Sequence, residues 1–190
     1  LGINDEANKI RVTDRDGNIY NSHFFQEHKE GIQINYFSPS GMVCKYENST
    51  GKKLLDFHRV RKEAPNPNKY TQPTGSGIVP FITPSIIRKT KEEKEIQTLI
   101  ITEGEFKAFA GDMAGMDIIG VGGINNFCEK DKKDLHHYLK DVITQRKVKN
   151  VVLLFDADCI SENYVKENIE KDLHSRLFSF YIAVKKFREY

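Results

Sequence analysis

The chain has 190 residues, of which 38% are hydrophobic and 29% charged, with a formal net charge of +2 at pH 7. This length suffices for one large domain or two small ones. No apolar run approaches the length of a membrane-spanning helix, and the N-terminal residues lack a signal-peptide pattern, so we expect a cytoplasmic protein without a membrane partner. Because the three cysteines have no CxxC spacing, we expect reduced thiols and no zinc ribbon.

The charge is distributed unevenly along the chain. Residues 1–90 contain 13 Lys and Arg against 9 Asp and Glu, a balance of +4, whereas residues 91–190 contain 16 against 18, a balance of −2. A basic first half favours a surface that faces a polyanion. A solvated, charged strand is the plainer interpretation of the same counts.

In the first half, short apolar segments alternate with turn signals. Ile10–Thr13 and Asn18–Tyr20 flank an Asp-Gly turn and predict a hairpin. A short helix is expected next, from Asn21 or Ser22 through Lys29. Three further segments predict an antiparallel meander: Ile32–Phe37, Met42–Glu47 and Lys53–Arg61.

The last strand of this meander carries two basic residues. Because Arg59 and Arg61 are two positions apart, a strand would project both from the same face. The following residues, Ala64–Gly77, are rich in Pro, Asn, Thr and Gly and predict an extended loop. The charged run Lys89–Glu95 marks the expected boundary between a domain at 1–92 and a domain at 93–190.

From Thr98 onward, predicted strands and helices alternate. The expected strands are Thr98–Thr102, Asp117–Val121 and Val151–Phe155, and the expected helices are Glu105–Met113, Glu129–Gln145 and Glu162–Lys186. This order predicts a parallel sheet with right-handed helical crossovers.

Acidic residues follow the first and third of these strands. Glu103 comes directly after the first, and Asp156 and Asp158 follow the third. Since ligands bind beyond the carboxyl ends of parallel strands, we expect the two acidic groups to open into one crevice. Neighbouring carboxylates repel each other, and a hard cation such as Mg²⁺ relieves this repulsion. An Asp-x-Asp pair is also a common turn or helix-capping feature, so the pair alone leaves both interpretations open.

Two other patterns carry no predicted chemistry. The glycine run Gly120–Gly123 lacks the third glycine of a dinucleotide fingerprint, because Asn125 stands there. The six histidines show no metal-ligand spacing. His136 and His137 are adjacent and are expected to point to different sides of the predicted helix, as surface or packing residues.

Taken together, the segments TEGEFKA, GVGG and LLFDAD resemble the Toprim domain of primases, type IA and II topoisomerases and some nucleases. The resemblance implies an α/β fold with a Toprim-like parallel sheet flanked by helices, preceded by a smaller α+β subdomain with an antiparallel meander. It also implies that Glu103, Asp156 and Asp158 coordinate Mg²⁺ (or Mn²⁺) and act in phosphoryl transfer. In that family the next strand supplies a further acidic residue, and the predicted elements of this sequence end before such a strand. The domain at 93–190 is therefore expected to be truncated at its C-terminal end.

The segment from Tyr36 to Pro73 is similar to the stretch before Toprim in DnaG-type bacterial primases and phage primase-helicases. This resemblance implies a basic subdomain in which four residues face the template strand or the phosphates of the incoming nucleotide: Arg59, Arg61, Lys69 and Tyr70. Lys107 stands where primases usually carry an acidic residue. It would contact phosphate or accompany altered or lost catalysis.

The resemblance therefore predicts a primase-type RNA polymerase core that makes primers on single-stranded DNA. Its implied substrates are nucleoside triphosphates, and its implied partner is a replicative helicase or helicase domain, as in phages and mobile elements. Two alternatives remain open. One is a Toprim-type nuclease or strand-cleaving enzyme, and the other is a non-catalytic nucleic-acid-binding module.

Overall fold

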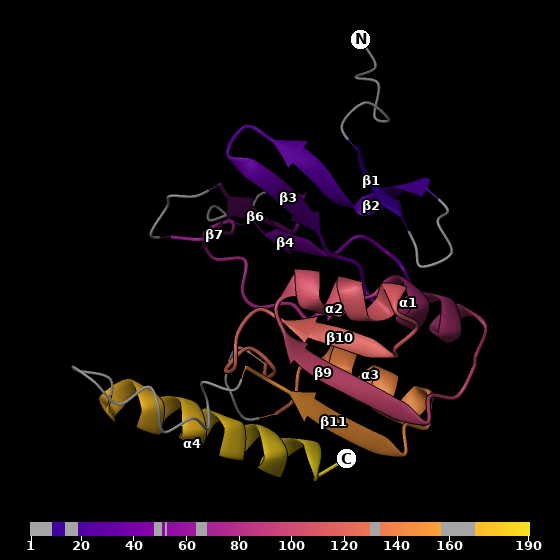
Figure 1. Ribbon diagram of the computed structural model, residues 1–190, viewed down its shortest axis with the longest axis vertical. Coiled ribbons are helices and arrows are strands. Elements are labelled where there is room, and N and C mark those ends of the chain that lie inside the picture. Colours follow the sequence, from indigo (N-terminus) through magenta and orange to yellow (C-terminus); the bar gives the residue numbers. More distant parts are fainter. Residues whose placement is uncertain are drawn as a thin grey trace. The chain divides into compact units, whose positions relative to one another are not determined.

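The chain forms two compact units, Leu1–Gly77 and Ile78–Tyr190. The computed structural model describes residues 9–13, 19–47, 51, 53–63, 68–129, 134–156 and 170–190. In the described residues, unit 1 consists of strands, and unit 2 combines strands and helices. Figure 1 labels these elements. Each unit is described by itself.

Unit 1 contains a five-stranded antiparallel sheet in the order β1-β2-β3-β6-β7. Its strands are β1 (Lys9–Thr13), β2 (Ile19–His28), β3 (Gly31–Asn35), β6 (His58–Lys62) and β7 (Tyr70–Thr71). The predicted hairpin is confirmed, since Val12 pairs with Tyr20 and Thr13 with Ile19.

The helix predicted after this hairpin is wrong, because β2 continues through His28. Strand β2 pairs with β1 on one side and with β3 on the other. Phe25 is buried opposite Ile34, with 4% and 0% of their surfaces exposed. Ladder bonds on both sides and burial of this aromatic side chain outweigh the helix-start signal of Asn21 and Ser22, which is only local.

The predicted meander is confirmed in part, because its second and third segments pair antiparallel, with Lys45 opposite Asp56, and Phe37 of the first segment bridges Val43 of the second. Strand β3 pairs directly with β6, and the chain between them folds back on itself as β4 (Lys45–Glu47) and β5 (Leu54–Asp56). This excursion is tied to the sheet by Cys44, whose N–H donates to Tyr36 O at 2.9 Å and whose carbonyl accepts from Phe57 N–H at 2.7 Å. The Tyr36 and Phe57 rings pack edge to face at 4.8 Å in the core of this unit.

Unit 2 is a four-stranded sheet in the order β11-β9-β10-β8, with helices packed on it. Its elements are β8 (Phe81–Ile82), α1 (Pro84–Lys91), β9 (Thr98–Glu103), α2 (Glu105–Met113), β10 (Ile118–Val121), α3 (His137–Gln145), β11 (Asn150–Leu154) and α4 (Glu170–Phe187). The three predicted strands are present and parallel. β8 adds an antiparallel edge, so the sheet is mixed.

Segments that the sequence placed before the domain boundary pack within unit 2. β8 pairs with β10, and Asp112 of α2 accepts hydrogen bonds from both the backbone N–H and the hydroxyl of Ser85 in α1. Lys89 forms a 2.6 Å ion pair with Asp117, beside the start of β10. Along the chain, the first compact unit ends at Gly77 and the second begins at Ile78, whereas the sequence placed the domain boundary between residues 92 and 93.

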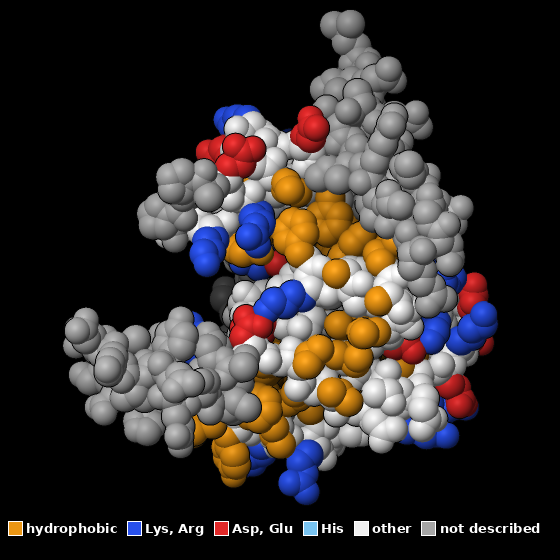
Figure 2. Space-filling view, viewed as in Figure 1, with side chains coloured by type: hydrophobic (Ala, Val, Ile, Leu, Met, Phe, Trp, Pro, Cys, Tyr) orange, Lys and Arg blue, Asp and Glu red, His pale blue; other side chains and the backbone are white. Residues whose placement is uncertain are grey.

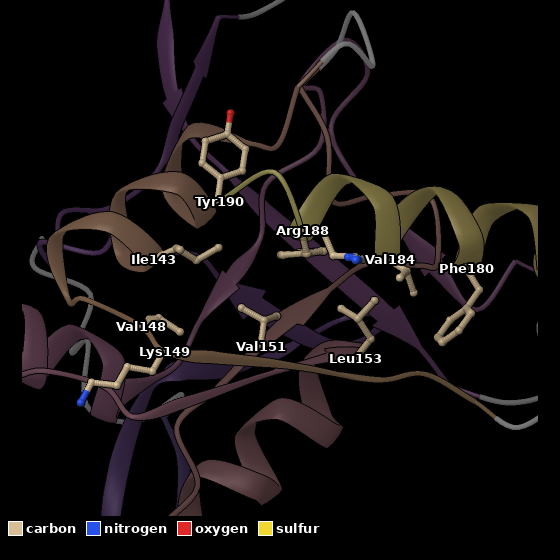
Figure 3. A pocket seen from close by; sticks show the side chains of 10 residues that line it. Ile143, Val148, Lys149, Val151, Leu153, Phe180, Val184, Arg188 and Tyr190 are labelled. Carbon is tan, nitrogen blue, oxygen red and sulfur yellow. The ribbon is translucent and has the colours of Figure 1, made fainter.

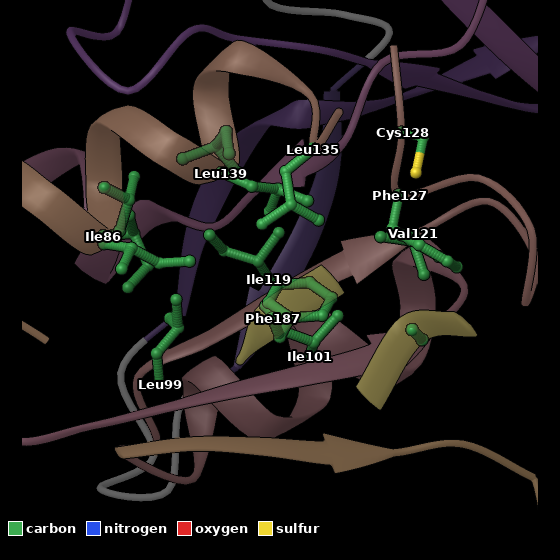
Figure 4. Close-up of a cluster of buried hydrophobic side chains, with 14 of the residues drawn as sticks. Ile86, Leu99, Ile101, Ile119, Val121, Phe127, Cys128, Leu135, Leu139 and Phe187 are labelled. Carbon is green, nitrogen blue, oxygen red and sulfur yellow. The ribbon is translucent and has the colours of Figure 1, made fainter. Parts of the chain in front are cut away.

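The two faces of this sheet are covered differently. Leu99, Ile101, Ile119 and Val121 point into a buried cluster with residues of α1, α3 and α4, of which Figure 4 labels Ile86, Leu139 and Phe187. α2 packs on the opposite face (Figure 1), close to Gly120. Alternation along the strands thus supplies both faces with apolar side chains, as expected for strands of a parallel sheet.

Helix α3 is shorter than predicted, because it begins at His137 and not at Glu129. His136 is its N-cap residue, with φ −55° and ψ 134°, and its ring accepts a hydrogen bond from Tyr138 N–H. The start predicted for the last helix at Glu162 lies outside the described residues, and α4 ends at Phe187, one residue beyond the predicted Lys186.

Part of the β11 surface is open. Val152 and Leu154 are 44% and 53% exposed. They lie on the same face of the sheet as α2, which packs on β9 and β10. Figure 2 shows hydrophobic side chains on this part of the surface and over the C-terminal part of α4. Within the described residues, none of the helices combines the length and the hydrophobicity that crossing a bilayer requires.

We predict that Gly120→Ala lowers the stability of the protein by about 1–3 kcal/mol, because an added methyl group overpacks the contact between α2 and β10. A Cβ at this position would lie 2.9 Å from Gly104 O and 3.0 Å from Ala108 Cβ. Urea denaturation measures the change. Gly111→Ala is the matched control, since its Cβ would meet the flexible Ile118 Cδ1 at 2.9 Å and alanine favours the helix. Equal losses in both variants would contradict the prediction.

Candidate functional site

The site is built on the aligned carboxyl ends of β9 and β11. These strands pair in parallel from Asn150 opposite Thr98 to Leu154 opposite Thr102. The buried Thr102 hydroxyl donates a 2.8 Å hydrogen bond to Leu154 O and so fastens the two strand ends together. The sequence analysis missed this positioning residue, since a threonine at the end of an apolar strand carries no distinguishing signal.

Two of the predicted acidic residues meet at this edge. Glu103 is the last residue of β9, and Asp156 lies two residues beyond β11. The Glu103 carboxylate accepts a hydrogen bond from the Asp156 backbone N–H, with 3.2 Å between Oε1 and N. Asp158, the third predicted ligand, lies outside the described residues.

Lys107 completes this group, which we call the acidic edge (Glu103, Lys107 and Asp156). Lys107 lies in the first turns of α2, and its ammonium forms an ion pair with Asp156 Oδ1. About half of each side chain is exposed, 53% for Lys107 and 50% for Asp156. The pair is therefore open to solvent and not part of the core.

The turn into α2 brings further positive potential to the acidic edge. Gly104 has φ 85°, a left-handed conformation that glycine adopts without strain, and its N–H donates to Val121 O at 2.7 Å. This sharp turn lets α2 begin at Glu105, directly after the strand. The N-terminus of a helix favours anions, including carboxylates and phosphates.

The chemistry of these residues fits a magnesium ion that is shared with a substrate. Mg²⁺ prefers oxygen ligands and is commonly held by one or two carboxylates together with substrate phosphates. Glu103 and Asp156 supply two such carboxylates from neighbouring strands. The Lys107 ammonium pairs with Asp156, and an exposed ion pair of this kind contributes only about 0–1 kcal/mol to stability.

The predicted basic residues of unit 1 form a second group, the Arg-Tyr cluster (Arg59, Arg61 and Tyr70). Arg61 pairs with Tyr70 across β6 and β7, and its Nη1 donates to the Tyr70 hydroxyl at 2.9 Å. The guanidinium carbons of Arg59 and Arg61 lie 4.5 and 5.5 Å from the centroid of the Tyr70 ring. Both arginines therefore project from the same face, as the sequence predicted.

Lys69 is exposed beside this cluster. Its carbonyl accepts a 3.0 Å hydrogen bond from Lys62 N–H, which fixes the backbone next to β7. Stacking on an aromatic ring and hydrogen bonding to a hydroxyl orient the guanidinium groups while leaving their charge intact. The cluster can thus present fixed positive charge to a phosphate backbone.

A separate apolar pocket of about 390 Å³ lies between β11 and the C-terminal part of α4. Figure 3 shows Val151 and Leu153 of β11 and Val184 of α4 among the residues that line it. The residues of the acidic edge and of the Arg-Tyr cluster do not line this pocket. It belongs to the packing of α4 against the sheet.

Three comparisons relate the chain to known proteins. A family model described as "Domain of unknown function (DUF3854)" matches residues 89–181, a range that includes β9, α2, β10, α3 and β11. No curated protein matches the chain. The chain is similar to a solved structure described as "Structure of the DnaG primase catalytic domain bound to ssDNA", with 14% identity and a TM-score of 0.41. That similarity covers 75% of this chain and 38% of the other chain.

We predict that Lys107→Gln raises the affinity of the acidic edge for Mn²⁺ up to about fivefold, because an exposed ion pair that competes for Asp156 contributes at most about 1 kcal/mol. Isothermal titration calorimetry with Mn²⁺ measures the change. Lys147→Gln is the matched control, since Lys147 forms an exposed 2.7 Å ion pair with Glu95, before the opposite end of β9. An affinity that falls, or that rises equally in the control, would contradict the prediction.

Proposed function

We propose that this chain is the nucleotidyltransferase core of a primase, which joins nucleoside triphosphates on a single-stranded DNA template with Mg²⁺ or Mn²⁺ as cofactor. The single observation that carries the proposal is the meeting of Glu103 and Asp156 at one sheet edge, from segments 53 residues apart. The order of the Toprim-like motifs and the basic segment before them support the same function.

In this proposal, Glu103 and Asp156 hold the metal ion, and Asp158 is the third ligand. The bound ion supplies stabilisation of negative charge on the attacking and leaving oxygens during nucleotidyl transfer. With Asp156 as a metal ligand, the Lys107 ammonium would be available to contact a phosphate oxygen of the substrate. The N-terminus of α2 favours the same anionic group.

The Arg-Tyr cluster has a separate role in the proposal. Arg59 and Arg61, with Lys69 beside them, bind phosphates of the template or of the incoming nucleotide. Contacts of this kind are tolerant of sequence and sensitive to salt. A primase that begins primers at many template positions needs such binding.

We predict that the full chain, given a single-stranded template, labelled nucleoside triphosphates and Mg²⁺ or Mn²⁺, forms labelled oligomers that resolve on a denaturing gel. Asp156→Asn and Glu103→Gln should each reduce the rate at least about 100-fold, because the metal supplies several kcal/mol of transition-state stabilisation. Glu95→Gln, which removes an exposed, lysine-paired carboxylate beyond the other end of β9, should retain the activity.

The same assay separates the proposal from its alternatives. Absence of oligomers, or equal synthesis by Asp156→Asn, would rule out the polymerase function. Metal-dependent nicking of plasmid DNA without synthesis would instead identify a strand-cleaving enzyme.

We predict that Arg61→Ala weakens binding of single-stranded DNA and reduces the slope of log K against log salt concentration by about 0.7, the value for one phosphate contact. Fluorescence anisotropy with a labelled oligonucleotide at several salt concentrations measures both changes. Lys45→Ala is the control, because it removes the same charge from the separate β4–β5 ladder, where Lys45 lies 3.9 Å from Asp56. The cluster has no role in binding if the two variants behave alike.

One observation favours a second function, a nucleic-acid-binding module without catalysis. The ion pair between Lys107 and Asp156 provides positive charge where a metal ion would otherwise be needed. Such a module would bind single-stranded DNA equally well with and without divalent ions. DNA binding that persists in EDTA, together with the absence of oligomer synthesis, would identify it.

A further inference from the structure

A group of three metal-ligating side chains lies away from the acidic edge, at the start of α3. It consists of Glu129, His136 and His137, and we call it the histidine cluster. One potential ligand atom from each residue lies within 4.8 Å of the others. The sequence analysis predicted no ligand role for these histidines, because it placed both in the middle of a helix.

The backbone brings Glu129 to the two histidines. Cys128 pairs with Leu135 in an isolated antiparallel bridge. On either side of this bridge, Glu129 N–H donates to Asp134 O and His136 N–H donates to Phe127 O, each at 2.9 Å. These bonds hold the segment before Glu129 against the residues that lead into α3, so the cluster is positioned by main-chain contacts.

The side chains converge because His136 precedes the helix. With ψ 134° it is extended, and the angular separation of neighbouring residues within a helix does not apply to this pair. The two imidazole rings stack with centroids 4.4 Å apart and planes at 22°. Glu129 Oε1 lies 2.8 Å from His137 Nδ1 and also accepts a 2.7 Å hydrogen bond from His137 N–H.

Hydrogen bonds fix the orientation of the His136 ring and the position of its proton. Nδ1 accepts from Tyr138 N–H at 3.2 Å, which leaves the ring proton on Nε2. The ring also makes a hydrogen bond to the backbone of Ile78. Metal-binding histidines characteristically donate their second ring N–H to a group of this kind.

We propose that Glu129, His136 and His137 bind a divalent transition-metal ion, with Zn²⁺ as the ion that this ligand set fits best. Two imidazoles and one carboxylate form a known zinc ligand set with an open position for water, whereas Mg²⁺ prefers oxygen ligands throughout. Ligands about 2.0–2.1 Å from a tetrahedral ion lie roughly 3.3 Å apart. Binding would bring the ligand atoms, which lie within 4.8 Å of one another, closer together, and the His137 side chain is 56% exposed and so has room to move.

The ion would cross-link two segments of unit 2. It replaces the contact between Glu129 and His137 with bonds to a single centre, and it exchanges the 3.2 Å hydrogen bond at His136 Nδ1 for a metal bond. Such a cross-link would hold the start of α3 beside the segment that contains Glu129 and so stabilise both. Because it involves no residue of the acidic edge, this site is independent of the proposed polymerase function.

The test measures Zn²⁺ binding by competition with a chromophoric chelator, together with the visible absorption spectrum of the Co²⁺-loaded protein. The wild-type chain should bind one Zn²⁺ at this site. His137→Ala and Glu129→Gln should each weaken its dissociation constant at least about tenfold. Zn²⁺ should also raise the melting temperature of the wild type more than that of either variant. These two exposed or partly exposed positions are chosen because His136 is buried and caps the helix.

Two control variants distinguish this site from other metal-binding positions. His23→Ala removes an exposed histidine of unit 1, and Glu95→Gln removes an exposed, lysine-paired carboxylate before β9; both should leave zinc affinity unchanged. The proposal is overturned if the wild type does not bind Zn²⁺, or if neither cluster variant weakens binding. It is also overturned if a control variant weakens binding equally, or if the cobalt spectrum shows thiolate charge transfer. Glu129→Gln alone decides the question if His137→Ala does not fold.

Discussion

The parallel pairing of β9 with a neighbour on each side is the constraint on which the acidic edge depends. Four core side chains of β9 and β10 are fully buried, with 0% of their surfaces exposed: Leu99, Ile101, Ile119 and Val121. Burial of each contributes about 1.5–3 kcal/mol to the stability of the fold. A one-residue slip of any strand would turn its buried side chains to the opposite face. Packing therefore fixes the register, and the Thr102 hydroxyl fastens the ends of β9 and β11. Glu103 and Asp156 adjoin because their strands end together.

Positive charge lies beside the carboxylates of this edge. Two carboxylates at adjacent strand ends repel each other, and the Lys107 ammonium together with the α2 N-terminus offsets that repulsion. Because the ion pair is exposed, its net contribution to stability is small and its partners can be exchanged. An acidic residue in place of Lys107 would remove this ion pair and add a further negative charge to the edge.

In unit 1, the basic side chains are positioned by stacking on an aromatic ring. Arg59 and Arg61 stand on one antiparallel strand and pack over a single tyrosine ring of the next. Each guanidinium is planar, so stacking restricts its orientation without neutralising its charge. A flexible lysine would have to lose more freedom to make an equivalent contact. The sheet that carries this cluster depends on β2 being a strand, since β2 joins β1 to β3.

The sequence by itself determined the elements whose signal is local or continuous. Apolar runs identified β9, β10 and β11, and the acidic residues near the carboxyl ends of β9 and β11 are the basis for the predicted ligand site. Tertiary structure decided what depends on distant partners. Residues 21–28 became a strand because β1 and β3 pair with it, and β3 paired with β6 because the excursion between them folded on itself. The pairing of Lys107 with Asp156 and the meeting of Glu129 with two histidines likewise required chain segments to converge, and residue spacing alone does not encode that convergence.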